Sequence, residues 1–73
     1  MEPLSANQKR LLDEIRDQCS RRGWFFINAT ELQDVHDMIA LANTRVIEVE
    51  DRDIRMDYLN NRVKAGEFVG KLN

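Results

Sequence analysis

Residues 45–59, RVIEVEDRDIRMDYL, decide the fold, because apolar and charged side chains alternate along two parts of this stretch. Apolar residues take every second position at 47–49 and again at 54–58, and the polar residues 51–53 separate the two runs. A period of two is typical of strands that bury one face, and a short polar break between such strands is typical of a turn. The stretch therefore predicts a β-hairpin with its turn at 51–53.

A helical alternative applies to the second half of the stretch. Four apolar residues also fall on one stripe of a helix: Val49, Met56, Leu59 and Val63. Asp53 would cap this helix and Gly66 would end it. The β-branched residues at 46, 47 and 49 favour a strand in the first half. The second half fits either structure, and we predict the hairpin.

The residues at the start of the chain predict a helix over 5–22. Ser5 and Gln8 have the spacing of a capping box, and Gly23 follows two arginines at the far end, where glycine commonly stops a helix. Four side chains share one face at helical spacing: Leu11, Leu12, Ile15 and Cys19. We expect this face to pack against the rest of the domain.

A short strand and a second helix follow. Residues 24–27, WFFI, predict the strand, because aromatic and β-branched side chains favour a pleated surface. A capping box at Thr30 and Gln33 predicts the start of the helix, which runs to about residue 42. Asn43 is expected in the left-handed position after it.

The chain of 73 residues thus predicts one small α+β domain in the order helix, strand, helix, hairpin. We expect the ordered core at about 5–59. Residues 60–73 hold two glycines and scattered apolar groups, so we assign them to a C-terminal tail, either frayed or partly ordered with Phe68 and Val69 folded back onto the domain. A domain of this size buries only about 60% of the surface of its unfolded chain, which leaves a thin stability margin.

The order of elements over residues 5–59 resembles that of winged-helix modules. The resemblance implies a DNA-binding transcription factor with the hairpin as its wing. In that family a helix-turn-helix precedes the hairpin, and its second helix enters the major groove. Residues 30–43 are long enough for one ordinary helix and contain no glycine that would divide it. The fold is therefore expected to be winged-helix-like without a divided helix-turn-helix.

The distribution of charge argues against DNA as the partner. Residues 24–61 carry three arginines and eight carboxylates, for a net charge of −5, whereas residues 1–23 carry +1 and residues 62–73 carry +2. Phosphate binding needs lysine and arginine on the docking face. A hairpin with three carboxylates at its tip would repel the phosphate backbone. We therefore expect a protein partner with a basic surface, and no direct binding of nucleic acid.

Two groups of residues are the candidate partner-binding sites. The acidic group lies on the predicted hairpin: Glu48, Glu50, Asp51 and Asp53. The other group joins cations to an aromatic side chain: Arg21, Arg22 and Phe25. The acidic face of the second helix is a further candidate. Strand alternation places Phe25 opposite Trp24 and Phe26, and in so thin a domain one of these two faces is expected to be exposed.

Catalytic and metal-binding patterns do not stand out. His36 lacks the cysteine and histidine partners of a zinc site. Cys19 lies on the apolar face of the first helix, where no base would activate its thiol. The sequence therefore predicts neither an enzyme nor a bound cofactor.

The small size and acidity of the chain resemble those of phage-encoded regulators that bind RNA polymerase. No residue motif carries this resemblance. It implies a small regulator that acts on transcription by binding a host protein. The single cysteine, the polar N-terminal residues and the lack of a long apolar run further predict a cytoplasmic monomer with no membrane segment.

Overall fold

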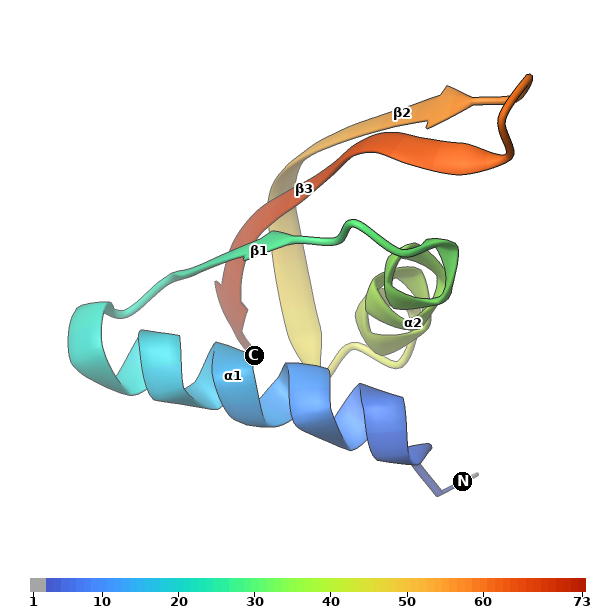
Figure 1. The fold of residues 1–73 in the computed structure, drawn as a ribbon. Helices are drawn as coiled ribbons and strands as arrows, with labels where there is room; N and C mark the ends of the chain where they lie inside the picture. The colour runs from blue at the N-terminus through green and yellow to red at the C-terminus, as the bar shows by residue number, and fades with distance from the viewer. Residues whose placement is uncertain (1–2) are drawn as a thin grey trace.

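The computed structural model describes residues 3–73 and confirms a small, single α+β domain. Five elements follow one another in the predicted order helix, strand, helix, strand, strand: α1 (Ala6–Arg22), β1 (Phe25–Asn28), α2 (Leu32–Asn43), β2 (Ile47–Asp57) and β3 (Arg62–Leu72). Both helices lie on the same side of a twisted antiparallel sheet, and its other side is left uncovered (Figure 1).

The central strand of the sheet comes from the end of the chain. The strand order is β1-β3-β2, and β3 pairs with β1 on one side and with β2 on the other. The assignment of residues 60–73 to a tail outside the core is therefore wrong. The two glycines of this segment made it resemble a tail, but both lie in β3 where another part of the chain approaches closely. A Cβ atom at Gly66 would overlap the carbonyl of Ala29, and one at Gly70 would overlap the carbonyl of Glu48.

The hairpin predicted within residues 45–59 is wrong: both of its expected strands belong to β2, and the hairpin of the structure pairs β2 with β3 through a turn at 58–61. Residues 51–53 lie inside β2, which is continuous from Ile47 to Asp57, so the helical alternative for the second half is wrong as well. The register shifts between Val49 and Asp51, which leaves Glu50 as the extra residue of a β-bulge. A bulge moves the alternation by one position, which explains why apolar residues change from odd to even positions along β2.

The caps of α1 agree with the prediction from the sequence, and those of α2 do not. Ser5 and Gln8 form the capping box, and Gly23 adopts the left-handed conformation with φ 83°. The N-cap of α2 is Glu31, which makes no side-chain capping bond, so the capping box at Thr30 is wrong. The left-handed residue after α2 is Arg45, with φ 64°, rather than Asn43.

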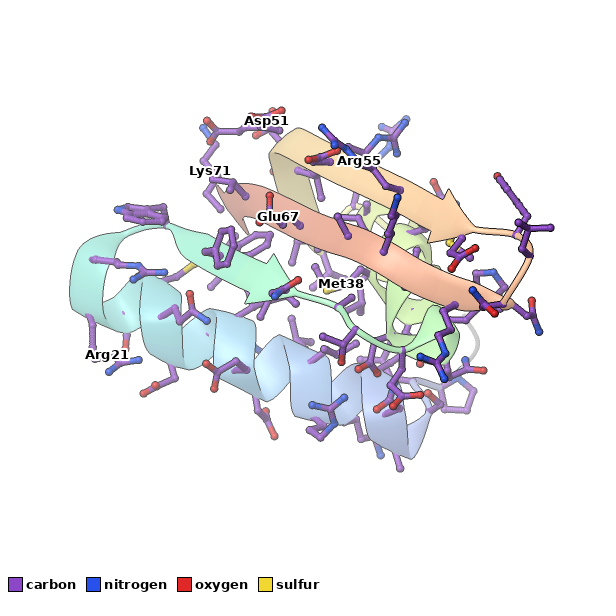
Figure 2. All side chains as sticks on the ribbon, turned by 45° about the horizontal axis from the view of Figure 1, so that its top comes forward. Arg21, Met38, Asp51, Arg55, Glu67 and Lys71 are labelled. Atoms are coloured by element: carbon purple, nitrogen blue, oxygen red, sulfur yellow. The ribbon has the colours of Figure 1, made fainter. Side chains whose placement is uncertain are left out.

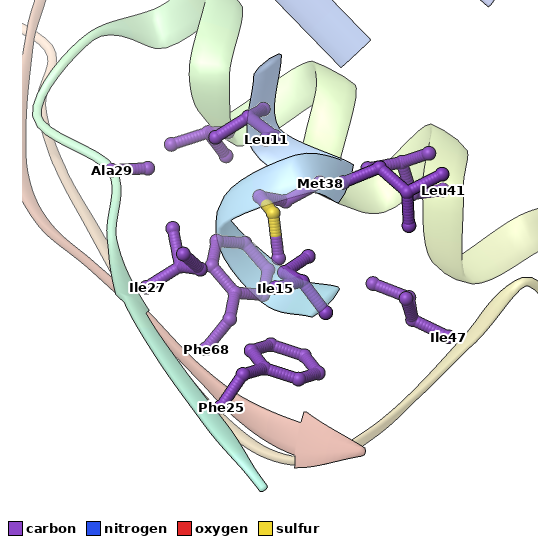
Figure 3. Close-up of a cluster of buried hydrophobic side chains, with 11 residues drawn as sticks. Leu11, Ile15, Phe25, Ile27, Ala29, Met38, Leu41, Ile47 and Phe68 are labelled. Atoms are coloured by element: carbon purple, nitrogen blue, oxygen red, sulfur yellow. The ribbon is translucent and has the colours of Figure 1, made fainter. Parts of the chain in front are cut away.

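The core lies between the helices and the covered side of the sheet (Figure 3). The largest fully buried side chains come from all five elements: Ile15, Phe25, Met38, Leu41, Ile47 and Phe68. The predicted apolar face of α1 contributes Leu11, Leu12 and Ile15, with Cys19 partly buried beside them. This packing fixes which side of each strand faces solvent.

Candidate protein-docking surface

The uncovered side of the sheet is the surface on which functional side chains gather. Phe25 and Ile27 of β1 and Phe68 of β3 point into the core, so their neighbours in the strands point outward. We call this outward surface, over the part of the sheet where all three strands meet, the open face. Its side chains are those of Trp24, Phe26, Glu48, Asp51, Asp53, Glu67, Val69 and Lys71. Figure 2 shows Asp51, Glu67 and Lys71 on this side, away from Met38 in the core.

Two aromatic side chains lie at the β1 end of the open face. Trp24 is 46% exposed and Phe26 is 39% exposed, which is unusual for rings of this size. Arg22 holds Trp24 in place, because its guanidinium lies 3.8 Å from the ring centroid and its Nε donates to the Trp24 carbonyl at 3.1 Å. The exposed ring is therefore oriented before any partner arrives.

A glutamine side chain closes the free edge of β1 at Phe26. Gln18 Nε2 donates to the Phe26 carbonyl at 3.0 Å, and Gln18 Oε1 accepts from the Phe26 N–H at 2.8 Å. The amide thus makes both of the bonds that a neighbouring strand would make. Gln18 is itself buried and is held by Glu14 and Arg22. This network fixes the backbone that carries the two exposed rings.

Carboxylates occupy the β2 side of the open face. Asp53 lies directly opposite Glu67, and Asp51 lies two residues further along on the same side. Asp53 bonds Arg55 at 3.1 Å, whereas Asp51 and Glu67 make no ion pair within residues 3–73. Like charges placed directly opposite each other on a sheet are destabilising. Two carboxylates without an ion pair in the described residues therefore lie next to the Phe26 ring, and Arg52 lines the same depression.

A shallow depression lies between the Phe26 ring and the carboxylates. It has a volume of about 50 Å³ and is lined by Phe26, Asp51, Arg52, Asp53, Glu67 and Val69. The open face can thus offer an apolar ring and negative charge within one small area. That combination suits a cation that reaches the surface on an apolar stem.

The acidic group predicted from the sequence divides into two parts. Asp51 and Asp53 face outward beside Phe26, and Glu48 bonds Lys71 at 3.7 Å at the end of the open face. Glu50 is the bulge residue, and it lines an open groove along the free edge of β2 rather than the open face. None of these residues lies at the hairpin tip.

The second predicted group is not brought together. Phe25 is fully buried in the core, so its assignment to the partner-binding surface is wrong: the exposed rings are those of its neighbours, Trp24 and Phe26. Arg21 pairs with Asp17 at 2.8 Å along α1, away from the open face (Figure 2). Arg22 remains near the surface, where it positions Trp24.

The acidic face of α2 is not available to a partner as the sequence suggested, because its carboxylates turn toward α1. Arg10 pairs with Asp34 at 2.9 Å, and Asn7 donates to both Asp34 and Asp37. Asp37 is only 4% exposed. Burial alone would raise the pKa of Asp37, but hydrogen bonds from Asn7, Gln33 and Gln8 outweigh it and hold that pKa below the usual 3.8.

Sequence reasoning missed Glu67, Val69 and Lys71, because they belong to the segment assigned to the tail. A signal was present: charged or apolar residues at 67, 69 and 71 alternate with the small or buried residues at 66, 68 and 70. This is the period of a strand with one buried side.

Within residues 3–73, no group of histidine, cysteine and carboxylate side chains has the arrangement of a metal site. Neither helix in this part of the chain is long and apolar enough to span a bilayer. Comparisons of the chain with models of protein families, with curated proteins and with solved structures gave no match.

Proposed function

We propose that this chain is a small protein-binding module that docks a partner on the open face. The observation that supports this proposal is the exposure of Trp24 and Phe26 beside Asp51 and Glu67, which lack an ion-pair partner within residues 3–73. Exposed aromatic side chains that are held rigid are typical anchors of protein interfaces. The carboxylates select a partner surface that carries lysine or arginine next to apolar groups.

The depression beside Phe26 favours a polypeptide over a small ligand. It holds about 50 Å³, far below the roughly 300 Å³ at which small-ligand pockets begin, and the larger groove of about 650 Å³, which Glu48 and Asp51 also line, is an open one along the free edge of β2. A protein surface covers a flat area of this kind, and the rings would lose their remaining contact with water on binding.

A module that binds without chemistry acts by occupying a surface of its partner, so we propose a regulatory role. RNA polymerase is the first purified protein to test, on the grounds of the small size and acidity of the chain. DNA is the second candidate partner. The observation in its favour is that the hairpin ends in residues 58–61 and carries Arg55, Arg62 and Lys64 against Asp57 near this end, so Glu50, Asp51 and Asp53 do not form its tip.

The test compares two variants of equal charge change. Asp51→Lys with Glu67→Lys reverses the open face, and Asp13→Lys with Asp17→Lys makes the same change on exposed positions of α1. Each variant is used as bait in a cell lysate and with purified RNA polymerase. The proposal expects the open-face variant to lose proteins that the wild type and the α1 variant retain. If both variants capture the same proteins, the open face is not the docking surface.

A further inference from the structure

The distal half of the hairpin projects beyond the helices as an arm, which we define as residues 54–64 (Figure 1). Ile54 and Val63 still pack against the core, but Tyr58 is 85% exposed and Leu59 is 97% exposed at the end of the arm. A two-stranded ribbon with no third layer is marginally stable in water. Large apolar side chains at its end therefore indicate that another surface covers the arm.

The arm and the open face carry opposite charge. Arg55, Arg62 and Lys64 against Asp57 give the arm a net charge of +2. The open face has four carboxylates, those of Glu48, Asp51, Asp53 and Glu67, against Lys71, and with Arg52, which lines the depression beside them, the net charge is −2.

Two cations of the arm, Arg55 and Arg62, point to the same side of the sheet as the carboxylates. Asp53 faces outward, so Arg55, two residues further along β2, also faces outward. Arg62 is paired with Asp57, two residues beyond Arg55, and lies on this side too. Figure 2 shows Asp51, Arg55 and Glu67 on one side of the ribbon. A single continuous surface thus changes from acidic over the body to basic over the arm.

We infer that the open face takes up the arm of a second copy of this chain, in a dimer with two antiparallel, face-to-face sheets. This inference rests on the proposed function and names the partner of the same surface. Tyr58 lies seven residues along β2 from Asp51, which is about 23 Å at 3.3 Å per residue. A two-fold axis near residues 54 and 55 therefore sets the end of each arm over the Asp51 row of the other copy.

The dimer accounts for three features of the single chain. The unpaired Asp51 and Glu67 receive cations from the other arm, and the cost of placing Asp53 opposite Glu67 falls. The exposed Tyr58 and Leu59 meet the exposed rings of β1. Because the interface is isologous, the same contacts between arm and open face form at both of its ends. This inference differs from the sequence-based expectation of a monomer.

Sedimentation velocity tests the dimer directly, from about 1 μM to about 1 mM protein, which spans weak to moderate association. The wild type is expected to pass from monomer to dimer in this range. Raising the salt from about 0.05 M to about 0.5 M should weaken the dimer, since the attraction between charged surfaces is screened. A wild type that stays monomeric over the whole range at low salt would overturn the inference.

Charge exchange tests the orientation. Asp51→Lys with Glu67→Lys reverses the open face, and Arg62→Glu with Lys64→Glu reverses the arm. Each variant alone should dimerise at least about tenfold more weakly, because its own arm and face now carry like charge. An equimolar mixture of the two should form a heterodimer, because each arm again meets a face of opposite charge. A mixture that associates no better than its components contradicts the arrangement.

The control and the fold are checked on the same samples. The α1 variant, Asp13→Lys with Asp17→Lys, should dimerise like the wild type. Recovery of association in the mixture also shows that both variants are folded, since unfolded chains would not restore it. A monomeric wild type whose open-face variant still loses captured proteins would refute the dimer and leave the proposed function standing. Equal capture by the open-face and α1 variants would refute the proposed function instead.

Discussion

Phe68 is the residue whose removal best tests the place of β3 in the fold. It is 1% exposed and lies in the strand between β1 and β2. Truncation of a buried phenylalanine to alanine costs about 3–5 kcal/mol, from lost transfer free energy and the cavity left behind. A domain of this length is stable by about 4–11 kcal/mol, at about 0.05–0.15 kcal/mol per residue. Phe68→Ala should therefore remove about a quarter or more of the free energy of unfolding.

The matched control is Phe26→Ala, which removes the same side chain from the open face. Phe26 is 39% exposed, so its truncation should cost only about 1–2 kcal/mol. Urea unfolding followed by the fluorescence of Trp24, the only tryptophan, measures both values. If Phe68→Ala costs no more than Phe26→Ala, β3 does not lie at the centre of the sheet. The end of the chain would then be the tail that the sequence predicted.

Three further substitutions and one binding assay follow from the structure. Asp37→Asn should lower the free energy of unfolding by about 1–3 kcal/mol at pH 7, because the carboxylate accepts three amide bonds. The lowered pKa of Asp37 means that this stabilisation is fully present above the ordinary value of 3.8 and is lost as the pH falls through the folded value. Urea titrations should thus show the two proteins converging in acid, and a gap that persists there contradicts this account. Gln18→Ala leaves the Phe26 N–H and carbonyl without their partner, which should cost about 1–2 kcal/mol and raise aggregation measured by light scattering on heating. Gly70→Ala places a methyl group against the Glu48 carbonyl, so a thermal melt should show a loss of about 1–3 kcal/mol, and an unchanged melting temperature would mean that β2 does not approach there. A gel shift on random duplex DNA at about 0.15 M salt should show no complex at micromolar protein, since the chain carries a net charge of −2, and a clear shift would favour the second candidate partner.

The elements that the sequence predicted well are those specified by neighbouring residues. The capping box of Ser5 and the left-handed Gly23 mark both ends of α1, and each needs only contacts within one turn. The exposure of one aromatic pair, Trp24 just before β1 and Phe26 within it, also follows from alternation alone. In α2 the helix begins at Leu32 after Glu31, which makes no side-chain capping bond, so the capping pattern at Thr30 and Gln33 was a poor guide to its start.

The misplaced turn has a different origin. The bulge at Glu50 and a turn both interrupt the alternation of apolar residues, and the sequence does not distinguish them. The two β3 glycines added to the error, because glycine is depleted in strands and enriched in loops. Their function is to let a carbonyl approach the strand closely, which depends on residues far away in the sequence. Only the assembled sheet shows that residues 66 and 70 are glycines because a carbonyl from elsewhere in the chain packs against each of them.

In this protein the net charge of a sequence segment differs from the net charge of the surface that its residues form. For this reason the sequence could locate the candidate site only in part. The acidic central segment loses Asp34 and Asp37 to contacts between the helices. Glu67 comes from a segment with net positive charge, yet it joins Asp51 on the open face. The preference for a protein partner therefore rests on the outward carboxylates of one side of the sheet, and no longer on the sum over residues 24–61. The same reasoning makes the arm basic although it begins in that acidic segment, and so a single ribbon offers both halves of a complementary contact.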